Sequence, residues 1–352
     1  MKPIERHHDW SRRQFLSAGL VAAGALLVPA ILRAAEPPGV VSLRKDFWAM
    51  GGWSYLEVSG ETRGAAEAGI KAMVESIRAI DRVFSVFDSR TPLSRLNSDS
   101  SCRAAIDDPL LLSALAASLC CARDFDGVFD PTVEPLMRRW GFRDSGAMTD
   151  QAASRTARDW DYRMIECDLV NARVTKESCS IQLDSGGWAK GLAAECSARA
   201  AMKSGASSAQ ANCGGDIFRM DRSGPPQWEC AIRDPLGTRT DCAVRVRHRF
   251  PTVATSGNYE TFRSSASGQL VGHLMDPRTG RPAATDLLSV SVFGHDGLAV
   301  DAASSALFVM GRNEAGRWLA ANPTFAAVLI DQRWPRLAEG LLVIGDLELV
   351  QT

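Results

Sequence analysis

The stretch Asp184-Ser-Gly-Gly-Trp-Ala-Lys-Gly191 (DSGGWAKG) lies between a short strand-like run, residues 180–183, and an alanine-rich helical pattern over 188–203. A carboxylate, two glycines and a lysine therefore meet at a strand-to-helix junction. Glycines let a ligand approach the backbone closely, and the first N–H groups of a helix lack partners within the helix. Such a corner suits phosphate groups. The stretch is neither a P-loop nor a GxGxxG motif, and an ordinary glycine-rich turn is the simpler explanation when it is considered alone.

Length and composition place the chain among globular proteins. Its 352 residues suffice for a large core in one or two domains, and the net charge of −1 gives no electrostatic case for nucleic acid. The nine cysteines include no CxxC pair, which argues against a zinc or thioredoxin-type site. Because nine is odd, at least one thiol is left over if the others pair within the chain.

The N-terminal region resembles a bacterial twin-arginine export signal. Arg12 and Arg13 precede an uncharged apolar run from residue 15 to residue 32. We expect a signal peptide over residues 1–35, a linker over 36–46, and a periplasmic protein with no stable membrane insertion after cleavage. The alternative is an uncleaved anchor, since eighteen uncharged residues come close to spanning a bilayer.

The rest of the chain predicts an α/β (α+β) fold with mixed sheets and flanking helices. Apolar residues at helical spacing predict helices over residues 64–84, 108–125, 188–203 and 299–310. A strand with a glycine break is expected over 47–58, and a surface helix and loop over 143–178. Further strands are expected over 209–219, 227–233, 242–250, 287–293, 324–330 and 341–350.

Oxygen-bearing residues suggest a metal site. Asp301 lies near the start of a predicted helix, and Ser305 follows one turn later. Together with a backbone carbonyl from Gly186-Gly187 they form an all-oxygen set, which favours Mg²⁺ or Ca²⁺ over zinc or copper. The alternative for Asp301 is a helix-terminal carboxylate without a ligand.

Other residues have both a chemical and a structural explanation. Lys190 can meet a phosphate as a point charge, or can be a solvated surface lysine. His273 is a candidate base because imidazole titrates near neutrality, or a loop histidine bonded to backbone. Met50, Phe87 and Phe129 can flank an aromatic ring system, or can be core residues.

The order of short motifs along the chain resembles the ApbE family of FAD:protein FMN transferases. The resemblance runs from about residue 47 to about residue 311. Its motifs are Met50-Gly51, Phe87-Asp-Ser with Leu96-Asn97, Gly127-Val-Phe-Asp-Pro-Thr-Val133 with Trp140-Gly-Phe142, the DSGGWAKG stretch, Asn212-Cys-Gly-Gly-Asp216, Thr255-Ser-Gly257, His273-xx-Asp-Pro-xx-Gly280 and Asp301-Ala-xx-Ser305.

The resemblance implies one bilobal domain over residues 47–350 with FAD between the lobes. It also implies a Mg²⁺-dependent reaction in which FMN moves from FAD to a Ser or Thr hydroxyl of a target protein and AMP leaves. The target is expected to be a periplasmic or membrane-bound electron-transfer subunit. The implied catalytic residues are His273, as the base, and Asp301. The FAD site would comprise Met50, Phe87, Val128, Phe129, Asp130, Asp184, Lys190 and Met275, and the metal site Asp301, Ser305 and the carbonyls of Gly187 and Ser304.

Three positions depart from the family pattern. Trp188 stands where many relatives have an aliphatic residue, and we expect its bulk to affect how the nucleotide sits. Ser305 replaces a threonine but keeps the hydroxyl, and Phe87 replaces a frequent tyrosine but keeps the ring. Two other functions stay open: an FAD pyrophosphatase that uses water in place of the protein hydroxyl, and a non-catalytic FAD-binding protein.

Overall fold

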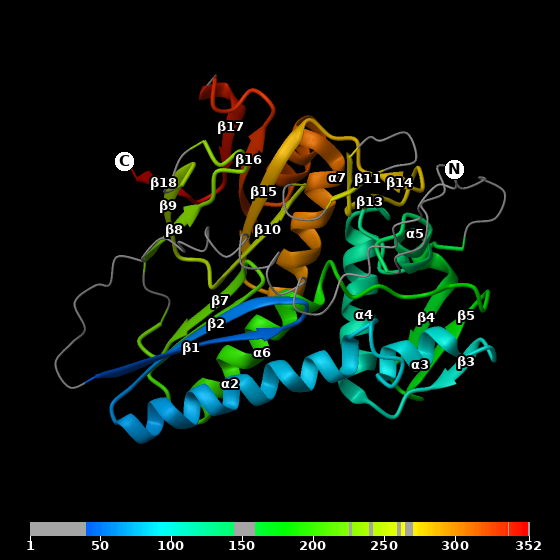
Figure 1. The fold of residues 1–352 in the computed structure, drawn as a ribbon, viewed down its shortest axis with the longest axis horizontal. Helices are drawn as coiled ribbons and strands as arrows, with labels where there is room; N and C mark the ends of the chain where they lie inside the picture. Colours follow the sequence, from blue (N-terminus) through cyan, green and yellow to red (C-terminus); the bar gives the residue numbers. More distant parts are fainter. Residues whose placement is uncertain are drawn as a thin grey trace, which may run out of the picture.

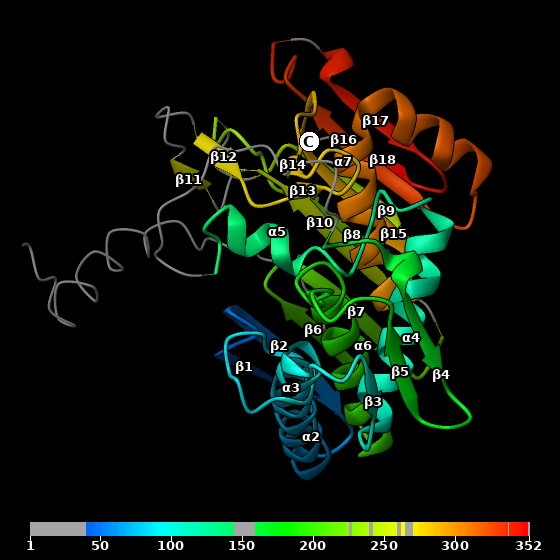
Figure 2. The ribbon, with the colours of Figure 1, turned by 90° about the vertical axis from the view of Figure 1, so that its right-hand side faces the viewer.

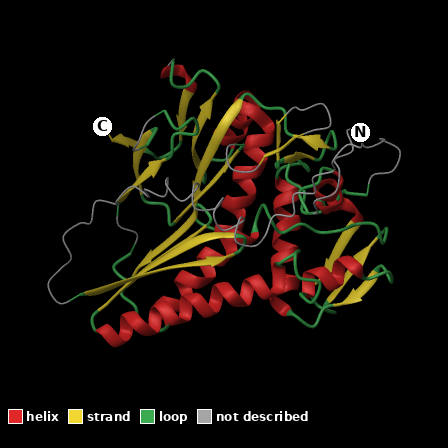
Figure 3. Ribbon diagram, viewed as in Figure 1, coloured by secondary structure: helices red, strands yellow, loops and turns green. Residues whose placement is uncertain are grey.

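An eight-stranded sheet organises the computed structural model, which describes residues 40–143, 159–224, 227–238, 242–258, 262–264, 270–336 and 338–350. All neighbouring strands of this sheet are antiparallel (Figures 1 and 3). Its strands, in spatial order, are β1 (Val41–Ala49), β2 (Gly52–Gly60), β6 (Ser208–Cys213), β7 (Asp216–Asp221), β10 (Thr252–Gly257), β15 (Leu287–Gly294), β16 (Ala326–Asp331) and β17 (Leu341–Ile344).

Smaller sheets flank the large one. One contains β18 (Glu348–Val350), β9 (Val244–His248) and β8 (Trp228–Ile232), and another contains β3 (Arg103–Ala105), β5 (Arg173–Lys176) and β4 (Ile165–Asp168). Two short hairpins pair β11 (Phe262–Ser264) with β12 (Leu270–Gly272) and β13 (Met275–Asp276) with β14 (Arg281–Pro282).

Several helices begin beside a residue whose side chain caps them, whereas α5 and α6 have no such side-chain cap. The α-helices are α2 (Arg63–Phe84), α3 (Pro92–Ser98), α4 (Pro109–Asp124), α5 (Glu134–Arg139), α6 (Ala189–Lys203) and α7 (Gly297–Ala321), with 3-10 turns η2 (Tyr162–Met164) and η3 (Ala338–Gly340). The side chains of Thr62, Asp108 and Asp296 accept hydrogen bonds from first-turn N–H groups of α2, α4 and α7. Within α7 the backbone is non-helical at Gly311, one residue after the predicted helix end at residue 310.

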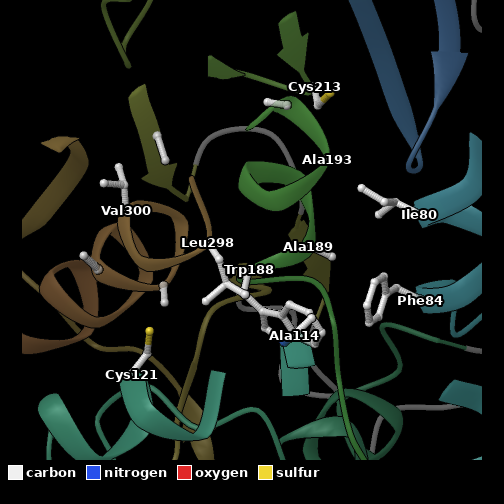
Figure 4. Packing of buried hydrophobic residues seen from close by; sticks show 14 of the residues in the cluster. Ile80, Phe84, Ala114, Cys121, Trp188, Ala189, Ala193, Cys213, Leu298 and Val300 are labelled. Atoms are coloured by element: carbon white, nitrogen blue, oxygen red, sulfur yellow. The ribbon is translucent and has the colours of Figure 1, made fainter. Parts of the chain in front are cut away.

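The core lies on both faces of the large sheet because strand side chains alternate. In β15, Val290 and Val292 join the core beneath α2, α6 and α7, whereas Phe293 joins a second core with β8 and β9. Figure 4 shows the first core around Trp188, whose fully buried ring meets Phe84 edge-to-face at a centroid distance of 5.0 Å.

A second part of the molecule supports the DSGGWAKG stretch. The small sheet β3–β5–β4 lies beside α3 and α4, on the right of Figure 1, and is again seen beside α4 in Figure 2. A disulfide joins Cys102 to Cys179 across 77 residues of sequence. Asn97 on α3 both accepts from Leu183 N, at 2.7 Å, and donates to Leu183 O, at 2.9 Å. The chain is therefore fixed immediately before Asp184.

Several predicted boundaries differ from the structure. The expected linker 36–46 is partly wrong, because β1 begins at Val41 and pairs along its length with β2. The expected single strand 47–58 is a hairpin, since Met50 and Gly51 adopt positive φ angles of 53° and 74° that make a two-residue turn. Within residues 143–178 the described part holds β4 and β5 rather than a surface helix.

The predicted signal peptide lies outside the described residues. Among the helices that are described, none combines the length and the apolar character needed to cross a bilayer.

His248 should make stability depend on pH. This β9 histidine is 5% exposed, accepts a 3.1 Å hydrogen bond from Trp228 Nε1, and burial lowers its pKa to about 4. Because the unfolded chain protonates first, the contribution of His248 is complete above pH 6.5 and is lost as pH falls toward 4. Between pH 7 and pH 5 we expect a loss of about 2 kcal/mol.

Urea unfolding of the wild type and of His248→Gln at the two pH values measures this contribution as a difference. His295→Gln, which changes an exposed histidine, should keep the wild-type pH dependence. An equal pH dependence in His248→Gln would contradict the assignment.

Candidate active site

A cavity of about 1050 Å³ opens where the β1–β2 turn, the DSGGWAKG stretch and the start of α7 come together. Most of the predicted site residues line it, although they come from segments up to 255 positions apart in sequence. These residues are Met50, Val128, Phe129, Asp130, Asp184, Gly187, Lys190, His273, Met275, Asp301 and Ser305. Phe87 and Ser304 are predicted members that are absent from this lining.

Helices α6 and α7 cap each other at their N-termini. Gly191 N, in the first turn of α6, donates to Asp301 Oδ2 at 3.0 Å, and Gly297 N, at the start of α7, donates to Glu195 Oε2 at 2.7 Å. Each carboxylate thus satisfies a backbone donor that has no partner in its own helix. Glycine is required at the contact, because a Cβ on Gly191 would lie 2.0 Å from Gly297 O. This packing fixes the position of Asp301.

Lys190 lies between two buried carboxylates. Its Nζ is 2.9 Å from Asp216 Oδ2 and 3.5 Å from Asp301 Oδ1, and it donates to Gly186 O at 3.2 Å. Burial lowers the pKa of Lys190, but Asp216 and Asp301 outweigh it and hold the pKa above its usual range. Burial and the charge of Asp216 raise the pKa of Asp301. The expectation that Lys190 meets a phosphate is untested, and here its charge is already paired within the protein.

Hydroxyl groups gather beside Asp301. Ser256 Oγ on β10 is 2.8 Å from Ser304 Oγ and 3.3 Å from Ser305 Oγ on α7. Ser304 also donates to Asp301 O at 2.8 Å, so its side chain fixes this turn of the helix and is itself buried. Ser305 faces the cavity and the backbone of Gly187, where an added Cβ would lie 3.3 Å from Ser305 Oγ.

These donors fit a hard divalent cation. The Asp301 carboxylate, the Ser305 hydroxyl and the Gly187 backbone supply only oxygen atoms, which is the chemistry that Mg²⁺ selects. The described residues contain no group of three or more His, Cys, Asp or Glu side chains able to hold a metal. A metal here therefore depends on carbonyl, hydroxyl, water or substrate oxygens in addition to the carboxylate.

Asp184 belongs to a buried ion network with Arg143. Arg143 Nη2 donates to Asp184 Oδ1, and Arg143 Nε donates to Glu134 Oε2 at 2.7 Å. Burial first, and then the charge of Asp184, raise the pKa of Glu134 to about 7. Phe87 stacks on the Arg143 guanidinium at 5.3 Å but is 72% exposed. Phe87 therefore contacts the network from outside, and its expected contact with FAD stays a prediction.

The remaining predicted residues shape the cavity wall. Asp130 accepts from Thr132 N, Thr132 Oγ1 and Tyr162 N at 2.6–3.0 Å, so its carboxylate braces the loop. Burial raises the pKa of Asp130 to about 6. His273 lines the cavity and meets the ring of Phe142 at a centroid distance of 6.5 Å.

Trp188 anchors the DSGGWAKG stretch to the core. Its side chain is fully buried, and its Nε1 donates to Asp184 O at 2.9 Å. The ring therefore packs beneath the corner and holds it, and the expectation that its bulk affects how the nucleotide sits stays a prediction.

Sequence reasoning assigned no individual role to three residues that line this cavity, or to Asp216, which pairs with Lys190 beside it. Trp48 and Trp53 face each other across the β1–β2 turn at 5.8 Å, and both are more than half exposed. Trp48 and Trp53 lie at equal distances in sequence on either side of the Met50-Gly51 turn, and this spacing could have indicated that they pair. Asp216 was visible only as part of a motif, and nothing local to Arg143 indicated its partner 41 residues away.

Gly191→Ala should lower the free energy of unfolding by about 1–3 kcal/mol, because the new methyl group overlaps the backbone of α7. The measurement is urea unfolding of both chains. Gly64→Ala is the matched control: it changes another first-turn helix glycine, whose Cβ would meet nothing within 4 Å. Equal stability of Gly191→Ala and the wild type would contradict the close contact.

Comparison with known proteins identifies relatives of this architecture. The sequence model of the ApbE family matches residues 50–329. A protein of Rhodobacter capsulatus named FAD:protein FMN transferase is 28% identical over 91% of this chain and 61% of its own length. One from Treponema pallidum with the same name is 31% identical, over 76% of this chain and 79% of its own. This chain thus spans less than two thirds of the Rhodobacter protein.

Solved structures share the fold. The crystal structure of the ApbE protein from Thermotoga maritima superposes with a TM-score of 0.71 at 24% identity, covering 88% of this chain and 97% of that one. The flavin transferase ApbE from Vibrio cholerae gives a TM-score of 0.70 at 21% identity, covering 87% and 97%. The predicted mixed α/β fold of the ApbE type is confirmed.

Proposed function

The chain belongs to the ApbE family, and from that premise we propose that it transfers the FMN half of FAD to a serine or threonine hydroxyl of a target protein. The hydroxyl oxygen forms a bond to the FMN phosphorus, the bond from that phosphorus to the AMP oxygen breaks, and AMP leaves. The observation that carries the proposal is the buried carboxylate of Asp301, fixed among oxygen donors at the wall of a cavity large enough for a dinucleotide.

In this proposal Asp301, Ser305 and the Gly187 carbonyl hold Mg²⁺, with the Ser304 carbonyl as a further donor. The ion would neutralise charge that develops on the leaving phosphate oxygens. Because Gly191 N and α7 already fix Asp301, the carboxylate needs little reorganisation when the cation binds.

In this proposal the other residues of the site bind FAD and orient it and the target hydroxyl. Met50, Val128, Phe129 and Met275 give the cavity its apolar wall, as ring systems require. His273 accepts the proton of the target hydroxyl, a role that its position in the lining permits. The Arg143–Asp184 pair fixes the corner against which the nucleotide packs.

The proposal is tested by incubating the chain with FAD, Mg²⁺ and a test protein that carries a flavinylation sequence. We expect the test protein to gain the mass of one FMN while AMP appears in equal amount. AMP and free FMN with an unmodified test protein would replace the transferase with a pyrophosphatase. Intact bound FAD would indicate a binding protein.

Asp301→Asn is the matched variant for this assay, since the amide keeps an oxygen acceptor for Gly191 N but loses the charge. Transfer should fall roughly 100-fold or more, because several kcal/mol of charge stabilisation depend on the metal. Circular dichroism checks that the variant folds. Undiminished transfer would remove Asp301 from the metal site.

The proposal also places the protein in the periplasm. The twin arginine of the N-terminal region supports this location, and so does the Cys102–Cys179 disulfide, because such bonds persist in oxidising compartments.

Changing both Arg12 and Arg13 to Lys should leave the precursor in the cytoplasm, as shown by cell fractionation and immunoblotting. Arg6→Lys, which changes an arginine outside the pair, should be exported normally. Normal export of the double variant would indicate another route.

A further inference from the structure

The Lys190 ammonium lies among three oxygen atoms of the protein. An ammonium group has three donors, and the three acceptors around it are Asp216 Oδ2 at 2.9 Å, Gly186 O at 3.2 Å and Asp301 Oδ1 at 3.5 Å. The contact with Asp216 is the shortest and that with Asp301 the longest. Lys190 therefore pairs mainly with Asp216, although its ammonium also lies near Asp301, the carboxylate assigned to the metal.

The turn before Asp216 brings its carboxylate to Lys190. It follows Gly214 and Gly215, whose positive φ angles of 61° and 104° form the turn between β6 and β7. A Cβ on Gly214 would lie 3.5 Å from Lys190 Cδ, so the lysine stem passes directly over this turn. Asp216 is 2% exposed. A buried carboxylate requires a partner, and Lys190 is the cation beside it.

We infer that Asp216 is a positioning residue, which holds the Lys190 ammonium away from Asp301 so that Asp301 Oδ1 stays available to a divalent cation. The inference rests on the proposed Mg²⁺ site and adds a residue to which no role was assigned. Asp216 acts through Lys190 and is not itself a metal ligand.

The reason is competition for one oxygen. Asp301 Oδ2 already accepts from Gly191 N, so Oδ1 is the oxygen that both the ammonium and a cation approach. Without the charge of Asp216, Asp301 would be the only carboxylate left among these contacts of Lys190. The ammonium would then move closer to Asp301. With Asp216 present, the ammonium keeps a charged partner when a divalent cation repels it from Asp301.

The inference is tested by measuring the dissociation constant of Mn²⁺ alone, a hard divalent stand-in for Mg²⁺, from the free-ion EPR signal with the full chain. Asp216→Asn should weaken binding roughly tenfold, about 1.4 kcal/mol. Lys190→Met should tighten binding, because the competitor is gone. In the Lys190→Met background, Asp216→Asn should have little further effect, since its influence passes through the lysine.

A full, additive effect of Asp216→Asn in the Lys190→Met background would show that Asp216 acts on the ion itself, and would overturn the inference. Unchanged or weaker binding by Lys190→Met would also overturn it, even if Asp216→Asn failed to fold. Lys176→Met is the matched control: Lys176 is more deeply buried than Lys190 and donates to the carbonyls of Leu96, Asp99 and Ile181. It should lower thermal stability without changing Mn²⁺ affinity.

These outcomes separate the inference from the proposed function. A wild-type chain that binds no Mn²⁺ overturns the metal site, and with it both proposals. A wild-type chain that binds Mn²⁺, together with an unaffected Asp216→Asn variant, overturns the positioning role alone.

Discussion

The reciprocal capping of α6 and α7 is the constraint on which the site depends. Two helix N-termini meet through Gly191 and Gly297, and each receives a carboxylate from the other helix, Asp301 in one direction and Glu195 in the other. Helix N-termini carry partial positive charge, so their close approach is unfavourable unless acidic groups lie between them. The same requirement that makes the helices pack therefore places a buried aspartate at the wall of the cavity.

Buried charged side chains also gather beside the cavity, in two groups. Asp301 and Asp216 share Lys190, and Glu134 and Asp184 share Arg143. The group of Asp301, Asp216 and Lys190 keeps an excess negative charge, which burial makes costly, whereas Glu134 also pairs with Arg138. An added divalent cation at the first group offsets that cost. This excess of negative charge supports the proposed Mg²⁺ site.

Much of the fold was predictable, and the exceptions have a common cause. Helix α2 agrees with its prediction to within one residue, because its apolar spacing extends over 22 residues. Helix α3 and strands β4 and β5 were missed, since elements of four to seven residues carry little periodicity and depend on distant contacts. The disulfide that fastens this region joins positions 77 residues apart, and nothing in the local sequence indicates the pairing.

In the site, too, the sequence indicates individual residues but not the distant residues with which they pair. The motifs identified Asp184, Lys190 and Asp301, and residue type suggested a phosphate contact for Lys190, which stays a prediction. The carboxylate partners of Lys190 in the fold lie 26 and 111 positions away, and the packing of α6 against β7 and α7 brings them to it. Trp188 shows the converse, since a large residue inside a chemical motif serves the core. A motif at a strand-to-helix junction thus contains both residues that pack in the core and residues that can take part in chemistry. The burial of each side chain and its hydrogen-bond partners show which of the two roles it has.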